Sequence, residues 1–471
     1  PNRRSGELIK LGFEELAKEI QGKLLPLKSI NDIFEGVSID SRVVKSGELF
    51  IAIRGEINDG HAFVDEALKN GAHGLLVDNQ FEDTASASQK TAVVVVENTH
   101  EAMMEMAGNY RNKCNVKVLG ITGSNGKTTT KEYAFALLNE VEKNVYRSTG
   151  NLNNLFGAPL AIFAMPQNSS VAVMEMGISV AGEMTRLARI IQPDLALITN
   201  IGPSHLEFLS SVEDVARAKL EIVSSENCDC PLIINADDEL LVREANKVKS
   251  GLITFAIDAR ADFKVDSIDK IDDSKQKITI DGKSFMLNSI GRHQVYNFLA
   301  AYAAVRTLGY EFKNVTTEQI NLSSAPMRGE TLELSGIRII NDAYNANPDS
   351  VKAGLEAFEL LAHRGRRVLI LGDMLELGEE ALKYHKRLGS SLKAFSFDLA
   401  LLVGPLSKAV IDGAVEAGID KEKLIGFADS SDAASEALNL LQQGDLVYVK
   451  GSRGIGLEKI IDLLKSPKGN G

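Results

Sequence analysis

The sequence predicts an α/β protein of three domains: a small α/β N-terminal domain, a central doubly wound parallel sheet with a phosphate loop and an antiparallel appendage, and a C-terminal Rossmann-like domain. The chain has 471 residues, which is too long for a single hydrophobic core. Short apolar runs of strand length alternate with helix-like stretches along most of the chain. This pattern changes near residues 97 and 326, so we expect domains at 1–97, 98–325 and 326–471.

The composition points to small-molecule partners. The 52 basic and 64 acidic residues leave a net charge of −12, which argues against a general binder of nucleic acid or of anionic membranes. No stretch is long and apolar enough for a membrane span, and Arg3 and Arg4 are not followed by the apolar segment of a secretion signal. Cys114, Cys228 and Cys230 are too few for a disulfide framework, so we expect reduced thiols. We therefore expect a cytoplasmic protein without membrane insertion, and nothing in the sequence requires more than a monomer.

The first two domains differ in the way strands and helices follow one another. The first alternates VSIDS, LFIAIRG, GLLVD and TAVVVVE with helical stretches such as HAFVDEALKNGA. The second begins near NTHEAMMEMAGNYRN and repeats strand, loop and helix through VKVLGIT, VAVMEMG, LALITNIG and PLIINADD, which is typical of a doubly wound parallel sheet. Between 262 and 290 the pattern becomes polar and apolar in alternation, and the Asp-Gly turn in KITIDGKSFML predicts an antiparallel hairpin. A long helix follows in VYNFLAAYAAVRTLG.

The third domain repeats the strand and helix pattern from Pro326 onward. Its apolar runs IRIIND, RVLILGD, LALLVG and LVYVKGS each precede a polar or glycine-containing turn. This arrangement favours a second parallel sheet of the Rossmann type.

The segment VLGITGSNGKTTTKEYAFALL predicts a phosphate loop between a buried strand and a helix. Glycines let backbone N–H groups turn toward phosphate oxygens, Lys127 can reach the terminal phosphates, and a threonine hydroxyl can bind Mg²⁺. The usual pattern has glycine where Ile121 stands, with Gly120 and Gly123 on either side. The order of strand, loop and helix nevertheless predicts binding of a nucleoside triphosphate.

Two side chains at neighbouring strand ends extend this site. Glu175 interrupts the apolar run VAVMEMG, and His205 follows the strand LALITNIG. Ligands of such sheets bind beyond the carboxyl ends of the strands, so we expect both residues to face the triphosphate as part of a metal site. Glu175 satisfied by backbone donors and His205 as an ordinary loop histidine are the alternatives.

Lys219 interrupts the apolar stripe of the helix VARAKLEIV. Val212, Val215, Ile222 and Val223 lie on the same stripe. The side chain either extends its ammonium to water from the edge of the stripe, or it is a buried amine with a lowered pKa. A neutral amine can react with carbon dioxide to form a carbamate, which is an oxygen ligand for Mg²⁺.

Taken together, these segments resemble the Mur ligase family, ATP-dependent enzymes that add amino acids to the bacterial cell-wall precursor. The matching stretches span nearly the whole chain: DSR, FIAIRG, TGSNGKTT, TGNLNN, MEMG, GPSHLEF, ARAKLEI, NADD, GRHQVYN, MRGE, NDAYNANPDS, LGDMLELG and VKGSRG. The phosphate loop with its shifted glycine is itself similar to the family's version. YNANPDS and GDMLELG look like the member that joins D-alanyl-D-alanine to UDP-N-acetylmuramoyl-tripeptide, through an acyl-phosphate intermediate.

The resemblance implies which residues bind ATP and metal. Those for ATP lie in the phosphate loop, in one later helix and in the third domain: Gly123, Ser124, Asn125, Gly126, Lys127, Thr128, Thr129, Asn297, Arg328, Asp342, Tyr344 and Asn345. Two Mg²⁺ ions are implied, one held by Thr128 and Glu175 and the other by His205 and a carbamate on Lys219. Lys127, Glu175, His205 and Lys219 would be the catalytic residues.

The resemblance also implies substrate contacts. Those for the uridine diphosphate end are Ser41 and Arg42, those for the muramoyl part are Asn151, Asn153 and Asn154, and those for the incoming dipeptide are Lys450, Ser452 and Arg453. Simpler interpretations exist for some of these residues. GNLNN is also compatible with a turn whose asparagines are left-handed, Arg42 with a surface charge, and NANPDS with a helix start at Pro348.

Two other functions fit parts of the sequence. A different ligase of the same family, such as the preceding enzyme of the pathway or a folylpolyglutamate synthase, would share the phosphate loop. The preceding ligase typically carries an Asp-Asn-Pro-Arg segment in its last domain, and this chain has none. A nucleotide-controlled switch without ligase activity would leave Lys219 unexplained.

Overall fold

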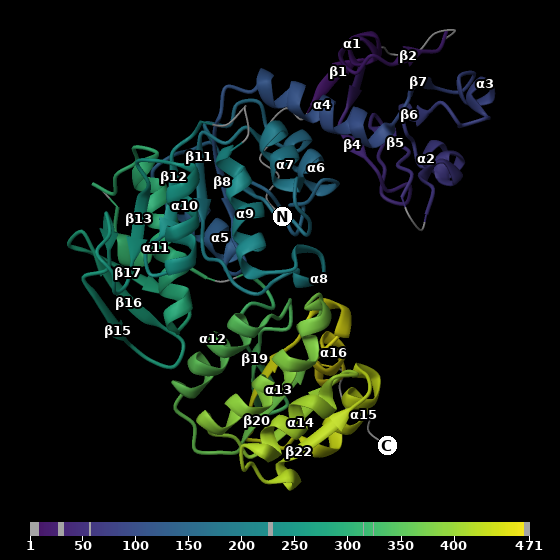
Figure 1. Cartoon of the computed structure of the whole chain (residues 1–471). Coiled ribbons are helices and arrows are strands. Elements are labelled where there is room, and N and C mark those ends of the chain that lie inside the picture. The colour runs from purple at the N-terminus through teal and green to yellow at the C-terminus, as the bar shows by residue number, and fades with distance from the viewer. Residues whose placement is uncertain are drawn as a thin grey trace.

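The computed structural model confirms the predicted three-domain α/β architecture, and its domains form three lobes in chain order (Figure 1). It describes residues 9–26, 33–55, 58–224, 229–313, 315–323 and 325–465. Cys228 lies outside these ranges, whereas Cys114 and Cys230 are buried and form no disulfide within them. No helix of the described ranges is both long and apolar enough to cross a membrane.

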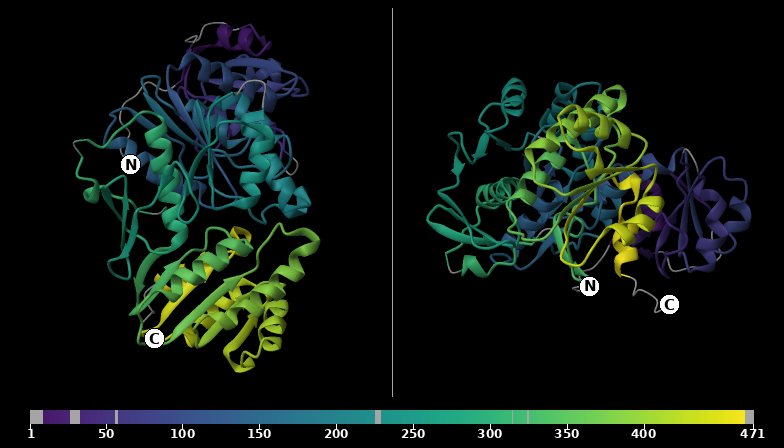
Figure 2. Two further views of the ribbon diagram at one scale, coloured as in Figure 1. Left: turned by 60° about the vertical axis from the view of Figure 1, so that its left-hand side comes forward. Right: turned by 90° about the horizontal axis from the view of Figure 1, so that it is seen from below.

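The N-terminal domain is built on a five-stranded sheet in the order β2-β7-β6-β5-β4. Only β2 is antiparallel to its neighbour. The elements of this domain are β1 (Lys10–Gly12), α1 (Phe13–Glu19), β2 (Lys23–Leu24), β3 (Ile33–Glu35), β4 (Val37–Ser38), β5 (Leu49–Ile51), η1 (Gly60–Phe63), α2 (Val64–Lys69), β6 (Gly74–Asp78), α3 (Thr84–Ala87) and β7 (Ala92–Val96). A long helix, α4 (Thr99–Lys113), leads from this lobe into the next (Figure 2).

The central domain contains a seven-stranded parallel sheet in the order β14-β13-β12-β11-β8-β10-β9, as the doubly wound prediction required. Its strands are β8 (Lys117–Thr122), β9 (Val145–Arg147), β10 (Val171–Glu175), β11 (Leu195–Ile198), β12 (Leu232–Asn235), β13 (Ile253–Ala256) and β14 (Phe263–Lys264). Its helices are α5 (Lys127–Asn139), α6 (Gly157–Phe163), α7 (Glu183–Ile191), α8 (Leu206–Leu209), α9 (Val212–Ser224), α10 (Glu239–Val248), α11 (Arg292–Thr307) and η2 (Thr317–Gln319). The expected antiparallel appendage is formed by β15 (Ser267–Lys270), β16 (Gln276–Ile280) and β17 (Lys283–Leu287).

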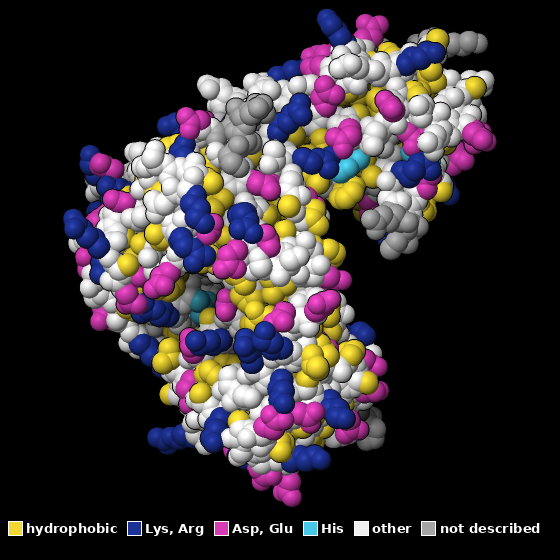
Figure 3. Space-filling model, in the orientation of Figure 1, with side chains coloured by type: hydrophobic (Ala, Val, Ile, Leu, Met, Phe, Trp, Pro, Cys, Tyr) yellow, Lys and Arg dark blue, Asp and Glu magenta, His cyan; other side chains and the backbone are white. Residues whose placement is uncertain are grey.

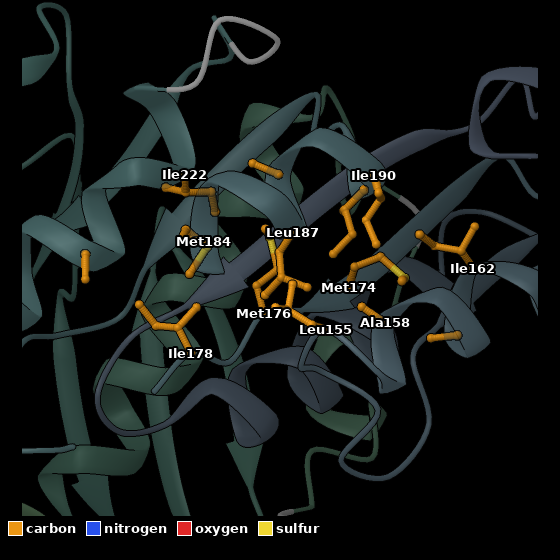
Figure 4. Close-up of a cluster of buried hydrophobic side chains, with 14 of the residues drawn as sticks. Leu155, Ala158, Ile162, Met174, Met176, Ile178, Met184, Leu187, Ile190 and Ile222 are labelled. Atoms are coloured by element: carbon orange, nitrogen blue, oxygen red, sulfur yellow. The ribbon is translucent and has the colours of Figure 1, made fainter. Parts of the chain in front are cut away.

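Helices cover both faces of the central sheet, which explains its continuous apolar strands. Leu119 and Ile121 of β8 belong to one buried cluster with residues of α5 and α11. Val118 belongs to a second cluster on the opposite face. Part of that second cluster is drawn in Figure 4, where side chains of β10, α6, α7 and α9 meet: Ala158, Ile162, Met174, Leu187, Ile190 and Ile222 among them.

The C-terminal domain has a six-stranded sheet in the order β18-β19-β23-β20-β21-β22, in which only β18 is antiparallel. Its strands are β18 (Glu330–Leu334), β19 (Ile337–Asn341), β20 (Arg367–Gly372), β21 (Leu399–Val403), β22 (Leu424–Phe427) and β23 (Leu446–Lys450). Its helices are α12 (Pro348–Glu359), η3 (Gly378–Glu380), α13 (Ala381–Ser391), η4 (Leu392–Ala394), α14 (Ser407–Glu416), η5 (Lys421–Lys423), α15 (Ser430–Leu440), η6 (Arg453–Ile455) and α16 (Glu458–Lys465). The sequence patterns had not indicated β18 or β22.

The strand order places the expected site. Strands β11, β8 and β10 are adjacent and parallel, so the loops that follow them leave the same edge of the sheet. The C-terminal domain lies close to this edge, and α8 lies at the junction between the two lobes (Figure 1).

Candidate active site

The phosphate loop connects β8 to α5 and depends on two glycines. Gly123 has φ +143°, and a Cβ there would lie 1.9 Å from Thr199 Oγ1. Gly126 has φ +83°, and its Cβ would lie 2.1 Å from Asn297 Oδ1. Any side chain at either position would collide with the neighbouring strand end or with α11, so the sequence requires glycine at both. Ile121, by contrast, is a buried residue of β8 and lies before the loop.

Lys127 lies at the start of α5, where its ammonium folds back over the loop. Nζ donates to the carbonyl oxygen of Gly123 at 2.6 Å and lies 3.4 Å from that of Ser124. Burial lowers the pKa of Lys127 to about 8, and the charge of Arg328 acts in the same direction, while Glu175 opposes it. This ammonium donates its hydrogen bonds to carbonyl oxygens of the loop. When a nucleotide is bound, it can donate them to phosphate oxygens instead.

Glu175 ends β10 and joins two loops. Its side chain is buried, Oε2 accepts a hydrogen bond from Thr128 Oγ1 at 2.8 Å, and Oε1 accepts one from Asn153 Nδ2 at 2.7 Å. Lys131, which the sequence analysis overlooked, is also buried, and its Nζ lies 3.7 Å from Glu175 Oε2. Glu175 therefore contacts side chains from the phosphate loop helix and from the asparagine segment, in addition to its backbone N–H bond to Ser148 Oγ.

The asparagines of GNLNN line the same cavity as the phosphate loop. None of Asn151, Asn153 and Asn154 has a positive φ, so the alternative of left-handed turn asparagines is wrong. Asn154 has a local role in addition, because its Oδ1 accepts hydrogen bonds from the backbone of Phe156 and Gly157 at the start of α6.

His205 and Lys219 both belong to the segment after β11. His205 has φ +55° and precedes α8, and its Nδ1 lies 2.6 Å from Oε2 of Glu376 in the C-terminal domain. Lys219 is only 1% exposed, so the alternative in which its ammonium reaches water is wrong. Burial, with a further contribution from the charge of Lys127, lowers the pKa of Lys219 well below its ordinary value.

The C-terminal domain closes the site from the other side. The guanidinium of Arg328 lies over the ring of Tyr344, 4.1 Å from its centroid. Asp342 accepts from Lys450 Nζ at 2.7 Å and from the hydroxyl of Tyr448 at 3.0 Å. Asn347 caps α12, as a helix start at Pro348 required, and its Nδ2 also donates to Asn125 Oδ1 of the phosphate loop at 2.8 Å.

These groups surround one cavity of about 570 Å³. Sites for small organic ligands have volumes of roughly 300–1,000 Å³. The predicted residues that line it are Ser124, Asn125, Gly126, Lys127, Thr128, Thr129, Asn151, Asn153, Asn154, Glu175, His205, Asn297, Arg328, Asp342, Tyr344, Asn345 and Lys450. In Figure 3 a recess separates the central and C-terminal domains, and basic side chains gather along its lower edge.

Other predicted residues do not line this cavity. Gly123 belongs to the phosphate loop, where its carbonyl oxygen accepts from Lys127, and Lys219 is buried close enough to Lys127 for the charge of Lys127 to affect it. Ser452 is buried and donates to the carbonyl oxygen of Ala346 at 3.3 Å, while Arg453 is exposed beside Glu458.

Ser41 and Arg42 lie on the N-terminal domain, apart from the cavity. Ser41 Oγ donates to Glu66 Oε2 at 2.5 Å. Arg42 forms a two-point contact with Asp40 and lowers the pKa of that carboxyl group to about 2. Both side chains therefore have local partners, and their predicted role in substrate binding stays a prediction.

The sequence analysis missed several polar residues of this cavity or its border: Asn200, Asn235, His293, Asn347, Asp349 and Glu376. Asn347 and Asp349 were quoted as part of NANPDS, and Glu376 as part of GDMLELG, but no role followed from the pattern. Burial lowers the pKa of His293 to about 4, so the imidazole is neutral at pH 7.

The donors at the phosphate loop fit a magnesium ion that is also bound by phosphate. Glu175 and Thr128 offer hard oxygen ligands side by side. Within the described residues no group of three or more His, Cys, Asp or Glu side chains could hold a metal ion alone. Mg²⁺ usually takes one or two protein ligands together with substrate phosphates and water, which is the situation this pair provides.

Comparison with known families gives three matches along the chain. The model described as Mur ligase family, catalytic domain, matches residues 33–111, the Mur ligase middle domain matches 121–305, and the Mur ligase, glutamate ligase domain, matches 327–453. The UDP-N-acetylmuramoyl-tripeptide–D-alanyl-D-alanine ligase of Bacillus subtilis is 35% identical over 464 residues, covering 98% of this chain and 100% of the relative.

Solved structures agree with the sequence matches. A crystal structure of MurF from Acinetobacter baumannii has a TM-score of 0.85 and 28% identity, over 98% of this chain and 100% of that one. The MurF ligase of Thermotoga maritima in complex with ADP has a TM-score of 0.77 and 26% identity, over 91% of this chain and 97% of that one.

Proposed function

The chain belongs to the Mur ligase family, and from this membership we propose that it is the ATP-dependent ligase that joins D-alanyl-D-alanine to UDP-N-acetylmuramoyl-tripeptide. Relatives with this activity in their names, and solved structures named MurF, align over nearly the full chain. The structural observation that carries the proposal is the single cavity that gathers the phosphate loop, Glu175, His205 and the closing residues of the C-terminal domain.

In this proposal ATP occupies the cavity with its phosphates on the loop. The backbone N–H groups from Gly123 to Thr129 and the N-terminus of α5 face the phosphates, and Lys127 exchanges its carbonyl partners for the β and γ phosphates. Asn297 lines the same cavity, where it would contact the adenine ring. Arg328, Asp342, Tyr344 and Asn345 cover the nucleotide from the C-terminal domain: all four line the cavity.

The reaction proceeds in two steps. The terminal carboxylate of the tripeptide attacks the γ phosphorus, the bond to the β-γ bridging oxygen breaks, and ADP leaves. The amine of D-alanyl-D-alanine then attacks the carbonyl carbon of the acyl phosphate, inorganic phosphate leaves, and the amine loses a proton. Closure of the C-terminal domain keeps water from hydrolysing the acyl phosphate.

Charge neutralisation is the main contribution of this site. A carboxylate approaching a triphosphate is repelled, and Lys127 offsets that repulsion by electrostatic positioning. Thr128 and Glu175 would hold one Mg²⁺ and His205 with a modified Lys219 a second, and these ions would neutralise phosphate charge and align the reacting groups. The contact of Asn153 with Glu175 would bring the muramoyl part next to the phosphate loop.

The modification of Lys219 is proposed as a carbamate. The amine is buried and its lowered pKa favours the neutral form that attacks carbon dioxide, releasing a proton. The product places a carboxylate-like oxygen ligand where the buried amine was. Its negative charge would also attract the nearby Lys127, whose charge disfavours an ammonium at Lys219.

The remaining substrate contacts complete the proposal. Ser41 and Arg42 would bind the uridine diphosphate end, and Asn151, Asn153 and Asn154 the muramoyl part. Lys450, Ser452 and Arg453 would contact the dipeptide. The enzyme would act as a monomer in the cytoplasm, where ATP is available, without nucleic acid and without membrane insertion.

The test is phosphate release with ATP, Mg²⁺ and UDP-N-acetylmuramoyl-tripeptide, with and without D-alanyl-D-alanine. We expect release to depend on the dipeptide and peptide bond formation to match it. Dependence on another amino acid would identify a different ligase of the family, and slow hydrolysis indifferent to every acceptor would identify a nucleotide switch.

The carbamate has a separate test in the variant Lys219→Ala. We expect a loss of activity that short carboxylic acids partly restore, because they can supply the missing oxygen ligand. Activity equal to that of the wild type would rule out the carbamate while leaving the substrate assignment intact.

A further inference from the structure

One contact between the central and C-terminal domains lies outside the proposed reaction steps. Oε2 of Glu376 lies 2.6 Å from Nδ1 of His205, and hydrogen bonding from the imidazole lowers the pKa of that carboxyl group, against the opposing effect of burial. Glu376 belongs to the segment 373–378 that follows β20, and His205 belongs to the turn between β11 and α8. The pair therefore spans two domains.

The segment 373–378 is held firmly by its own domain. The backbone N–H of Met374 donates to Nε2 of the buried His385 at 3.0 Å, and that of Leu375 donates to Ser452 Oγ at 2.9 Å. Asp373 is buried and accepts from the backbone of Leu406 at 2.9 Å. These hydrogen bonds fix the position of the backbone that carries Glu376.

The same segment docks closely on the turn that carries His205. The backbone N–H of Glu207 donates to the carbonyl oxygen of Glu376 at 3.2 Å. A Cβ on Gly378 would lie 3.0 Å from Glu207 Cα, so the two backbones are in van der Waals contact. Leu377 is 2% exposed and belongs to the same buried cluster as Leu206. Figure 1 shows α8 at this junction.

Both members of the pair have strained backbones. His205 has φ +55° and Glu376 has φ +61°, a region that residues with a Cβ seldom adopt. Such strain persists only where surrounding contacts over-determine it, and it is concentrated at functional sites and switch regions. Here two strained turns face each other across a domain boundary with their side chains in contact.

We propose that Glu376 is a positioning residue that couples closure of the C-terminal domain to the orientation of the His205 imidazole. The inference rests on the proposed function, in which His205 acts in the active site. A carboxylate at Nδ1 selects the tautomer and the rotation of the ring and leaves Nε2 for the site. When the domain opens, the carboxylate departs, and His205 loses this orientation.

The kinetic test compares Glu376→Ala and Glu376→Gln with Glu379→Gln, an exposed glutamate three residues away. We expect Glu376→Ala to lower kcat by about 10- to 100-fold with the KM values of all three substrates nearly unchanged, the scale of loss that follows from misplacing an active-site group by about 1 Å. Glu376→Gln keeps an oxygen that can accept from Nδ1, so it should retain more activity, and Glu379→Gln should match the wild type.

A second measurement reports the contact without relying on turnover. Nuclear magnetic resonance of ¹⁵N-histidine-labelled protein, without Mg²⁺, can follow the Nδ1 signal of His205, which is assigned by its loss in His205→Gln. Glu376→Ala should shift this signal and Glu379→Gln should leave it in place. Circular dichroism checks that the variants remain folded.

Two outcomes would overturn the inference. A rise in the KM of D-alanyl-D-alanine with unchanged kcat would make Glu376 a substrate contact instead. An unshifted His205 signal in Glu376→Ala, together with full activity, would show that Glu376 does not orient His205. Failure of the proposed function is recognised separately, because phosphate release by the wild type would then be the same with and without D-alanyl-D-alanine.

Discussion

The cavity at the phosphate loop and the proposed substrate contacts on the N-terminal domain are built differently. Around the phosphate loop, residues from widely separated stretches, such as Lys127, Glu175 and Arg328, line one cavity. On the N-terminal domain, the side chains of Ser41 and Arg42 contact Glu66 and Asp40 of the same domain, and both residues lie apart from that cavity. A wide bay lies between the N-terminal and C-terminal domains (Figure 3).

This difference suggests that the cavity carries out catalysis and that the N-terminal domain contributes to substrate binding. Interactions made only in the transition state raise kcat, whereas contacts with a remote part of the substrate mainly affect its binding. We therefore expect substitutions in the cavity to lower kcat and substitutions on the N-terminal domain to raise one KM. The predictions below test this contrast in order of expected effect.

Lys127→Ala should have the largest effect. The variant loses the cation that faces the phosphates, and kcat should fall by about 1,000-fold or more, as for other groups that stabilise transferring phosphoryl charge. The measurement is phosphate release at saturating substrates, with circular dichroism as the folding control. Retention of more than about a tenth of the wild-type rate would contradict the role of this lysine.

Glu175→Gln should lower kcat by about 100-fold, because it removes a hard oxygen ligand beside Thr128. It also removes one of the two carboxylates near the buried Lys131 ammonium, at 3.7 Å, and leaves only the partly exposed Glu132 at 3.5 Å among the ion pairs of the described residues, which should lower the melting temperature. The double variant Lys131→Met, Glu175→Gln separates the two effects. Its melting temperature should recover while its activity does not, and recovery of activity would place the role of Glu175 in stability alone.

Arg42→Ala should raise the KM of the UDP-linked substrate by about tenfold and leave kcat and the KM of ATP unchanged. The guanidinium lies on a domain that contributes nothing to the cavity. Steady-state kinetics with each substrate varied in turn provides the measurement, and Lys45→Ala, an exposed neighbour, is the control. A fall in kcat for Arg42→Ala would contradict the assignment of the N-terminal domain to substrate binding alone.

The smallest expected effect is the pH dependence of ATP affinity. Lys127 has a pKa of about 8 in the free protein, so it loses its charge as the pH rises through that value. ATP favours the charged form, and the affinity should therefore fall by about fivefold between pH 7 and pH 9. Isothermal titration calorimetry with Mg²⁺ and ATP measures it. Lys127→Arg should show a flatter profile because its guanidinium stays charged.

The sequence predicted elements most reliably where a pattern is local and repeated. The apolar runs around Leu119, Val173 and Leu197 correspond to adjacent parallel strands, and the hairpin turn at Asp281–Gly282 joins β16 to β17. Two edge strands were missed, since β22 has a single buried residue and β18 alternates exposed with half-buried positions. A weak apolar pattern of that kind does not distinguish a strand from a loop.

The site shows the same division. Glu175 and Lys219 were singled out because a charged residue inside an apolar pattern needs an explanation. Lys131 escaped attention although it is equally buried, because the helix KTTTKEY is mostly polar in sequence and only tertiary packing covers it. Glu376 was part of a quoted motif, but its partner His205 is 171 positions away in the chain, which no local pattern reveals.

The sequence by itself determined the three-domain α/β class, the phosphate loop and the family, because each depends on residue types at short fixed spacings. Only the tertiary structure decided that the ammonium of Lys219 is buried, that Lys450 pairs with Asp342, and that Glu376 reaches His205. Burial and cross-domain contacts depend on how separate elements pack against one another. That packing is a property of the whole chain and leaves no signal in the spacing of neighbouring residues.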